Sequence, residues 1–196
     1  YSEDYLKENR VNANLFHDGS RPTTLKQRYR ASGKTLLRVS HLRNHDISLE
    51  IMEAMFEAIT SNIKEYDLII FSDFNYGCLP QALVDRLIAV CKENRIIAVA
   101  DSQSSSQVGD VSRYKDLEFI TPTEREARLA MRDFHSGLVV LAESLRSKTN
   151  SKNIFITLGS EGLLIHAEIT SENRWLTDRL PAFNTAPKDT AGAGDS

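Results

Sequence analysis

The sequence has few cysteines, no long apolar run and no excess of positive charge. Its two cysteines, Cys78 and Cys91, lie in no CxxC or Cys/His pattern, which excludes a disulfide scaffold or zinc finger and favours a reducing compartment. No apolar run approaches the roughly 20 residues of a transmembrane helix, and the N-terminal residues lack the apolar core of a signal peptide. We therefore expect a cytoplasmic protein with no membrane partner.

The charge balance is close to neutral, with 27 acidic and 24 basic residues and a net charge of −3. Such a chain has no general attraction to nucleic acid, so a phosphate ligand must be held by a local site. Neither a GxxxxGK[ST] loop nor a GxGxxG fingerprint is present, which excludes a P-loop enzyme and argues against a Rossmann-type oxidoreductase. The five histidines form no metal-binding motif. These absences favour a small charged metabolite as the ligand.

The apolar pattern predicts strands that alternate with helices. Apolar steps of three and four residues predict helices, and short continuous apolar runs predict buried strands. Helices are expected at residues 47–63, 80–93, 123–132 and 136–148. Strands are expected at residues 24–31, 35–40, 68–71, 96–100, 117–120, 153–158, 163–166 and 176–180. The alternation predicts an α/β fold with a mostly parallel sheet.

Polar residues follow the predicted strands directly. Asp73, Asp101 and Thr121 come after the first three buried strands, and the segment 159–162, Gly-Ser-Glu-Gly, follows the fourth. Ligands of open α/β sheets bind outside the carboxyl ends of the strands. We expect the functional site at this edge.

The last residues, Asp189-Thr-Ala-Gly-Ala-Gly-Asp195-Ser, form a glycine-rich turn between two carboxylates. Glycines let backbone N–H groups approach phosphate oxygens closely, and a carboxylate such as Asp195 accepts the proton of an attacking hydroxyl. The alternative is a flexible Gly/Ala tail. The motif is suited to phosphoryl transfer.

This Asp-Thr-Xaa-Gly-Ala-Gly-Asp motif resembles the signature of the ribokinase-like, PfkB-type carbohydrate kinases. The segments 21–28, 36–39 and 70–73 look like the heptose 7-phosphate kinase branch, the kinase half of bifunctional lipopolysaccharide-heptose enzymes. The resemblance implies a three-layer α/β/α fold with a small β lid. It also implies that residues 1–196 are a single truncated kinase domain, a fragment cut at both ends, with residues 20–45 contributing to the lid.

The resemblance further implies an enzyme that transfers the γ-phosphoryl group of ATP to a hydroxyl of a sugar or sugar phosphate, with Mg²⁺. Heptose 7-phosphate is the best candidate substrate, and the lid is the expected surface of a homodimer. Asp195 would be the general base, and the amides of Gly192, Ala193 and Gly194 would form the anion hole. Asp189 would shape the turn or meet substrate or metal-bound water.

Two further segments resemble elements of the same family. Glu126 matches a glutamate that acts on Mg²⁺ through water, although Thr123 stands where the family has Asn; a capping box made by Thr123 and Glu126 is the alternative. Thr157, Gly159 and Gly162 match a turn that borders the nucleotide, with a structural β-turn as the alternative.

Lys26, Arg28 and Asp73 are candidates for binding the substrate. Lys26 and Arg28 alternate along a predicted strand and so share one of its faces. That face would meet a sugar phosphate, or it would be a solvated edge whose charges oppose aggregation.

The sequence departs from the heptose kinase branch at two places. Asn75 and Tyr76 replace a Gly-Lys pair, and Ser102-Gln103 replaces Pro-Lys, so each place has lost a lysine. Both changes reduce the positive charge available to a phosphorylated ligand. They favour a different sugar, or a second hypothesis: a catalytically inactive, kinase-like module that senses a sugar or serves as a structural subunit.

Overall fold

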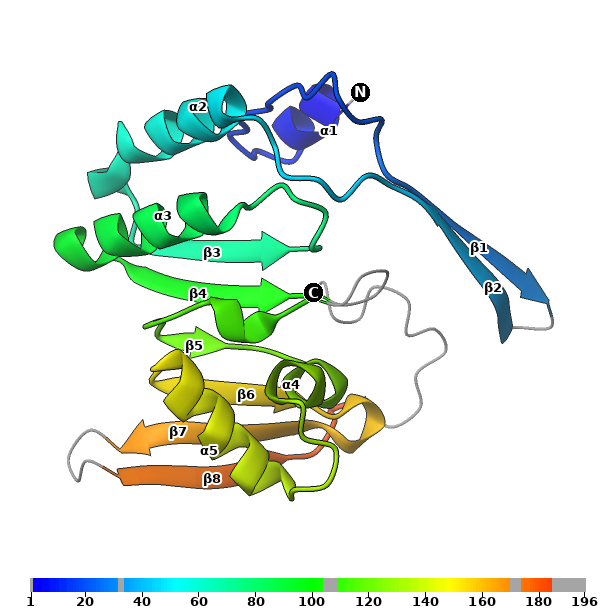
Figure 1. Cartoon of the computed structure of the whole chain (residues 1–196), viewed down its shortest axis with the longest axis vertical. Helices are drawn as coiled ribbons and strands as arrows, with labels where there is room; N and C mark the ends of the chain where they lie inside the picture. The colour runs from blue at the N-terminus through cyan, green and yellow to red at the C-terminus, as the bar shows by residue number, and fades with distance from the viewer. Residues whose placement is uncertain (1, 32–33, 104–108, 170–173, 185–196) are drawn as a thin grey trace.

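The computed structural model describes residues 2–31, 34–103, 109–169 and 174–184 (Figure 1). The helices are α1 (Ser2–Glu8), α2 (Leu49–Thr60), α3 (Gln81–Asn94), α4 (Glu124–Met131) and α5 (Leu138–Thr149), with 3-10 turns η1 (Ile63–Glu65), η2 (Val111–Arg113) and η3 (Gly159–Glu161). The strands are β1 (Leu25–Ala31), β2 (Lys34–His41), β3 (Leu68–Asp73), β4 (Ile97–Ser102), β5 (Phe119–Ile120), β6 (Asn153–Thr157), β7 (Leu163–Ile169) and β8 (Arg174–Leu180).

The main sheet has six strands in the order β3-β4-β5-β6-β7-β8. The pairs from β3 to β6 are parallel, and the pairs β6–β7 and β7–β8 are antiparallel. Parallel neighbours need crossover segments, and the runs containing α3, η2 and the pair α4–α5 supply them. The predicted α/β fold with a mostly parallel sheet is confirmed.

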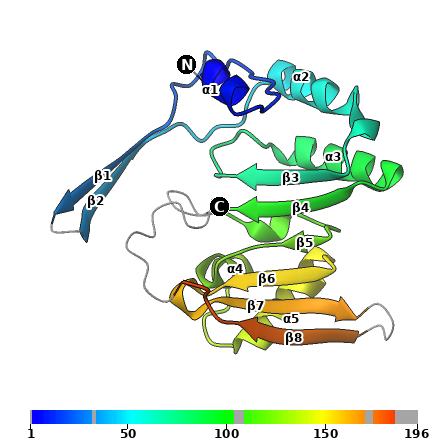
Figure 2. The same cartoon turned by 180° about the vertical axis from the view of Figure 1, so that it is seen from behind.

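The core lies between α3, α4 and α5 and one face of this sheet. Phe71, Ala100, Ile120, Ile154 and Ile156 point to that face and join the buried cluster with residues of the three helices. On the opposite face, Leu68, Ile70, Ile97 and Leu176 are each more than 40% exposed. Figure 2 views this face, with the strands in front of the helices. Within the described ranges, helices thus form one of the two layers that the resemblance implies.

The helices begin where local chemistry favours it. Helix α2 starts after Ser48, whose Oγ accepts from the backbone N of Ile51 at 3.2 Å and so caps the helix. The helix ends at Thr60, earlier than predicted, and the chain continues into η1. Helix α1 was not predicted because its seven residues bury no side chain and show no apolar face. None of the helices in the described ranges has the length and apolar character needed to cross a bilayer.

Strands β1 and β2 form a separate antiparallel hairpin within the predicted lid region. The hairpin projects beyond the carboxyl ends of β3 and β4 and away from the helices (Figures 1 and 2). A two-stranded sheet is marginally stable by itself. Its position therefore depends on how its base is held.

Candidate functional site at the carboxyl edge of the sheet

The parallel pairing of β3 to β6 brings the ends of these strands to one edge. Ser72 pairs with Asp101 and Asp73 with Ser102, and the Thr121 hydroxyl donates to the Asp101 carboxylate at 3.3 Å. The residue after Pro122, Thr123, forms a bridge with Thr157 at the end of β6. The sequence candidates at these strand ends therefore lie along a single edge, as predicted.

Asp73 is 3% exposed and is the centre of a hydrogen-bond cluster. Its Oδ2 accepts from Arg113 at 2.8 Å and from the Tyr114 hydroxyl at 3.0 Å, and its Oδ1 accepts from the backbone N of Asn75 at 2.8 Å. Burial, with the Asp73 charge, raises the pKa of Tyr114 well above its usual value, so the hydroxyl keeps its proton and donates. The contacts give Asp73 a structural explanation that the sequence did not suggest.

Asn75 links the loop after β3 to the end of β4. Its φ of 58° lies in the left-handed region, which asparagine tolerates better than most residues. Its Nδ2 donates to the Ser102 hydroxyl at 3.1 Å and to the Gln103 carbonyl at 2.6 Å. The two places where the sequence departs from the heptose kinase branch are thus in direct contact, and one amide group bridges them.

The base of the hairpin is fastened to the same loop by Arg21. Its guanidinium donates to Asp18 and to the carbonyls of Tyr76 and His45, each at 2.6 Å. Gly77, at φ +79°, permits a close approach of the His45 carbonyl that a Cβ atom would prevent. The hairpin is therefore held at a defined position over the edge of the sheet.

Lys26 of β1 contacts the aromatic side chains of that loop. Its ammonium lies 4.6 Å from the ring centroid of Phe74 and 5.2 Å from that of Tyr76. The two rings stack with centroids 6.2 Å apart. Cation–π attraction therefore adds to the contacts that hold the hairpin near the end of β3.

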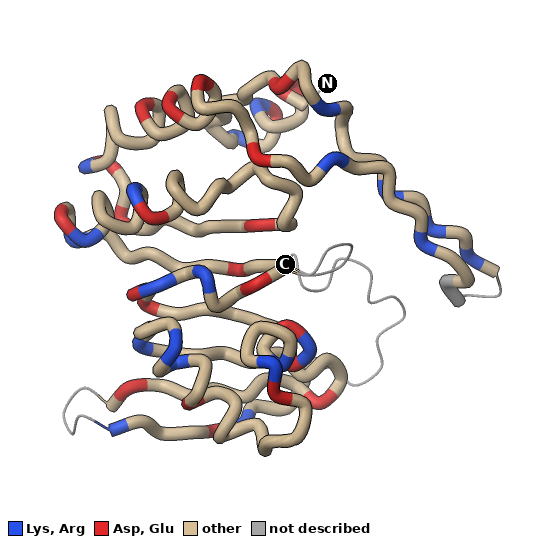
Figure 3. The backbone as a smooth tube through the Cα atoms, in the orientation of Figure 1, with Lys and Arg blue, Asp and Glu red and all other residues tan. Residues whose placement is uncertain are grey.

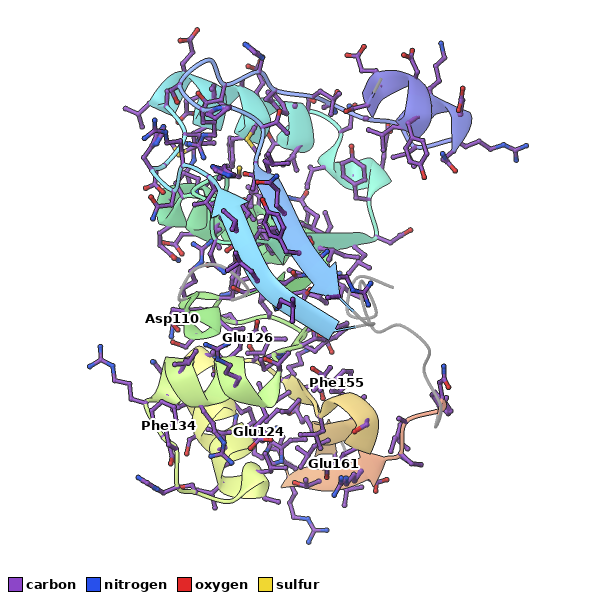
Figure 4. All side chains as sticks on the ribbon, turned by 90° about the vertical axis from the view of Figure 1, so that its right-hand side faces the viewer. Asp110, Glu124, Glu126, Phe134, Phe155 and Glu161 are labelled. Atoms are coloured by element: carbon purple, nitrogen blue, oxygen red, sulfur yellow. The ribbon has the colours of Figure 1, made fainter. Side chains whose placement is uncertain are left out.

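Glu126 forms the capping box that the sequence predicted as one of its two roles. Its Oε2 accepts from the Thr123 backbone N and hydroxyl at 2.8 Å each, and the Thr123 hydroxyl accepts from the Glu126 backbone N. The carboxylate is 8% exposed and lies at the start of α4, near the edge of the sheet (Figure 4). Among the described residues, no cluster of three metal-ligating side chains occurs. A single carboxylate at this edge fits Mg²⁺, which usually keeps several waters and few protein ligands.

Gly159 and Gly162 flank the 3-10 turn η3 between β6 and β7, where the sequence indicated a turn. Gly162, at φ +97°, lies against the Leu180 carbonyl, so a side chain there would collide with the end of β8. Gly159, at φ +60°, faces open space. Gly162 therefore has a packing reason to be glycine, whereas Gly159 needs only its backbone conformation.

The candidates of the C-terminal motif, Asp189, Gly192, Ala193, Gly194 and Asp195, lie outside the described residues. Sequence reasoning had missed Arg113, Tyr114 and Phe74 as parts of the site. No motif marks Arg113 and Tyr114, because they lie 40 and 41 residues from Asp73 along the chain and meet it only through the fold. Phe74 is adjacent to Asp73, but its contact with Lys26 also depends on the fold.

An open, mostly parallel α/β sheet with a hairpin over its carboxyl edge defines an α/β protein whose ligand is expected at that edge. The chain belongs to the pfkB family of carbohydrate kinases, whose family model matches residues 1–196.

Among curated proteins, the chain is similar to bifunctional protein HldE. It is 28% identical to HldE of Sulfurimonas denitrificans over 198 residues, which cover 97% of this chain and 39% of the relative. It is 30% identical to HldE of Aliarcobacter butzleri over 188 residues, which cover 94% of this chain and 37% of the relative. The chain thus spans well under half the length of these relatives.

Solved structures support the fold. Ribokinase from Giardia lamblia matches with a TM-score of 0.75 at 16% identity, over 99% of this chain and 60% of that one. Phosphofructokinase-2 from Escherichia coli matches with a TM-score of 0.74 at 16% identity, over 98% of this chain and 60% of that one. At such low identity these similarities establish the ribokinase-like fold alone.

Proposed function

We propose that this chain is part of an ATP-dependent kinase that phosphorylates a hydroxyl of a sugar or sugar phosphate, with heptose 7-phosphate as the favoured substrate. The observation that carries this proposal is the anchored hairpin over the carboxyl edge of the sheet in a pfkB family member. The similarity to HldE supports the choice of heptose 7-phosphate. A lid above such an edge encloses a ligand and excludes water during phosphoryl transfer.

Each proposed residue has one task in this reaction. Asp195 accepts the proton of the attacking hydroxyl, and the amides of Gly192, Ala193 and Gly194 donate to the phosphoryl oxygens as negative charge develops. Asp189 shapes the turn that holds these groups. A bound Mg²⁺ would neutralise charge on the phosphates of ATP.

We assign the nucleotide and its Mg²⁺ to the part of the carboxyl edge near the ends of β5 and β6. Glu126 would accept a hydrogen bond from metal-bound water, a role compatible with its capping bonds because a carboxylate has several acceptor positions. Thr157, Gly159 and Gly162 line the nucleotide. Gly159 is the better candidate of the two glycines for close approach, because its Cα faces open space.

The test is sugar-dependent consumption of ATP by the full chain with Mg²⁺, using heptose 7-phosphate. We expect Asp195→Asn to reduce turnover by about 10²-fold or more while nucleotide affinity changes little, since the base acts in the chemical step. Asp178→Asn, an equal charge change on exposed β8, is the matched control and should keep full turnover. Binding of heptose 7-phosphate without turnover by the unchanged chain would instead support the inactive, sugar-sensing module.

We also propose that the chain forms a homodimer through the lid. Leu25, Tyr29, Leu37 and Val39 share one face of the hairpin, and the first three are each more than 50% exposed. Pairing two copies would cover this apolar face and stabilise a hairpin that is marginal alone. Light scattering should show a dimer that Leu37→Glu converts to a monomer, and a monomeric unchanged chain would contradict the proposal.

A further inference from the structure

A cavity of about 330 Å³ lies at the amino edge of the main sheet, opposite the carboxyl edge. Its lining comes from the carboxyl end of α3 and from residues that begin or directly precede β4, β5 and β6. Figure 3 shows acidic and basic positions gathered where α3 ends, at the left of the view, whereas the hairpin lies at the right. The volume is within the range of small-molecule sites. The length of the strands separates this cavity from the proposed kinase site.

The buried part of the lining is apolar. Ile88 and Cys91 of α3, Ala98 of β4 and Leu117 before β5 are between 1 and 7% exposed. Burial raises the pKa of the Cys91 thiol, so this side chain adds no charge to the cavity. Such a lining favours a ligand with an apolar body, because contact removes apolar surface from water.

The outer part of the lining is charged. Lys92 forms an ion pair with Asp116 at 2.8 Å, and Lys152 forms one with Glu118 at 2.8 Å. The fifth charged residue, Arg95, has no carboxylate partner among the residues that the structure describes. Both carboxylates are thus balanced by lysines, and the lining keeps a single unpaired positive charge.

Arg95 follows the last residue of α3 and caps the helix with its backbone. Its φ of 59° lies in the left-handed region where glycine is usual, and its backbone N donates to the Lys92 carbonyl at 3.3 Å. The cap therefore does not require the guanidinium. The carboxyl end of a helix attracts cations, which is the alternative reason for an arginine here. Arg132 has the same place after α4, at φ 53°, and does not line the cavity.

We infer that this cavity binds a small organic monocarboxylate, with its apolar body against the buried part of the lining and its carboxylate on Arg95. A guanidinium offers two parallel N–H donors that match the two oxygens of a carboxylate. One unpaired positive charge balances a monoanion, whereas Asp116 and Glu118 oppose a second negative charge such as that of a phosphate dianion. The inference does not depend on the proposed function, because none of these residues takes part in the proposed phosphoryl transfer.

The first experiment titrates the full chain with benzoate and follows the backbone amide signals by NMR. Benzyl alcohol has the same ring without the charge, and acetate has the charge without the ring. Benzoate should bind at least about tenfold more tightly than either, because benzyl alcohol lacks the charged hydrogen bonds and acetate lacks the apolar contact. The largest shifts should fall on residues that line the cavity.

The second experiment repeats the titration with two variants. R95Q should bind benzoate about tenfold more weakly and benzyl alcohol equally well, because only the charged contact is lost. R132Q makes the same charge change at the same kind of helix end and should keep full affinity for benzoate. Thermal unfolding of both variants checks that each remains folded.

Four outcomes would overturn the inference. They are absence of saturable benzoate binding, equal affinity for benzoate and benzyl alcohol, full benzoate affinity in R95Q, and equal losses in R95Q and R132Q. The last outcome would indicate that arginines at helix ends act on the anion only through general charge. Since no ATP or sugar is used, the outcome of this titration and that of the kinase assay are independent.

Discussion

Asp73 and the basic face of the hairpin, formed by Lys26, Arg28 and Arg38, lie at the same edge of the sheet, and they differ in how their charges are balanced. Asp73 is buried and accepts three hydrogen bonds from Arg113, Tyr114 and Asn75. Lys26 and Arg28 are exposed and have no carboxylate partner among the described residues. The sequence had grouped all three as candidates for binding substrate.

The difference shows that burial and partners decide what a charged residue at this edge does. Removing a buried carboxylate leaves its charged partner unpaired in a region of low dielectric, so the main effect of the change is on stability. Removing an exposed cation costs the protein little stability, so the main effect of the change is on binding of the ligand. Four experiments test this comparison, in order of decreasing effect on stability.

The largest effect is expected for Asp73→Ala. The change removes the carboxylate that pairs with Arg113 and accepts from the fully buried Tyr114 hydroxyl, while Arg113 keeps its bond to the Leu79 carbonyl. Breaking a buried pair in this way costs about 3–5 kcal/mol, measured as the free energy of unfolding in urea. The control is Glu53→Gln, which breaks the exposed pair with Arg86 and should leave the unfolding midpoint unchanged. Equal losses in both variants would contradict the distinction between the two kinds of charge.

Gly77→Ala tests the joint between the hairpin and the loop after β3. A Cβ atom there would collide with the His45 carbonyl, and the residue has φ +79°. We expect a loss of about 2–3 kcal/mol, together with release of the hairpin base and weaker sugar binding. Gly159→Ala has a similar φ and open space around it, so it should lose only about 1 kcal/mol in the same unfolding measurement. If Gly77→Ala costs no more than Gly159→Ala, the joint is not a fixed anchor.

Thr123→Ala and Glu126→Gln separate the structural and functional roles of the capping box. Thr123→Ala removes one cap and should cost about 1 kcal/mol of unfolding free energy. Glu126→Gln keeps an acceptor for the cap but removes the charge, so stability should change by less than about 0.5 kcal/mol. The Mg²⁺ concentration needed for half-maximal activity should rise about tenfold or more in Glu126→Gln. An unchanged Mg²⁺ requirement would show that Glu126 only caps the helix. Its role would then be structural, like that of Asp73.

The smallest effect on stability is expected for Arg28→Gln. Removing a charge directly opposite Arg38 relieves repulsion, so the free energy of unfolding should rise by about 0.3 kcal/mol. The gain should shrink as salt concentration rises, because salt screens exposed charges. A loss of stability comparable to that of Asp73→Ala would place Arg28 among the structural charges.

Much of the fold was predictable because its signals are local. The Ser48 cap and the Thr123–Glu126 capping box each depend on residues three apart, and the structure forms both. Strands β3, β4 and β6 are continuous apolar runs, and the polar residues that follow them meet at one edge once the strands are parallel. Helix α1 was missed because it buries no apolar face that a pattern could reveal.

The site was predictable only in part. The sequence indicated that Asp73, Glu126 and the turn at 159–162 lie at the edge of the sheet, but it gave no reason to connect Asp73 with Tyr114. It presented Asn75 and Ser102 as two separate departures, whereas Asn75 hydrogen-bonds to Ser102. These contacts join segments about 30 to 40 residues apart in the sequence, and local residue spacing does not predict contacts at such separations. The roles of Asp195 and the Gly192–Gly194 amides stay predictions, since these residues lie outside the described part of the chain.

The sequence by itself determined the α/β fold class, the family signature and the alternation of Lys26 with Arg28, because periodicity and short motifs are properties of neighbouring residues. Only the tertiary structure decided which charges are available to a ligand. Asp73 is paired because the fold brings Arg113 and Tyr114 to it, whereas Lys26 and Arg28 have no carboxylate partner among the described residues. Burial and pairing depend on contacts between distant segments, and those contacts exist only after the chain has folded.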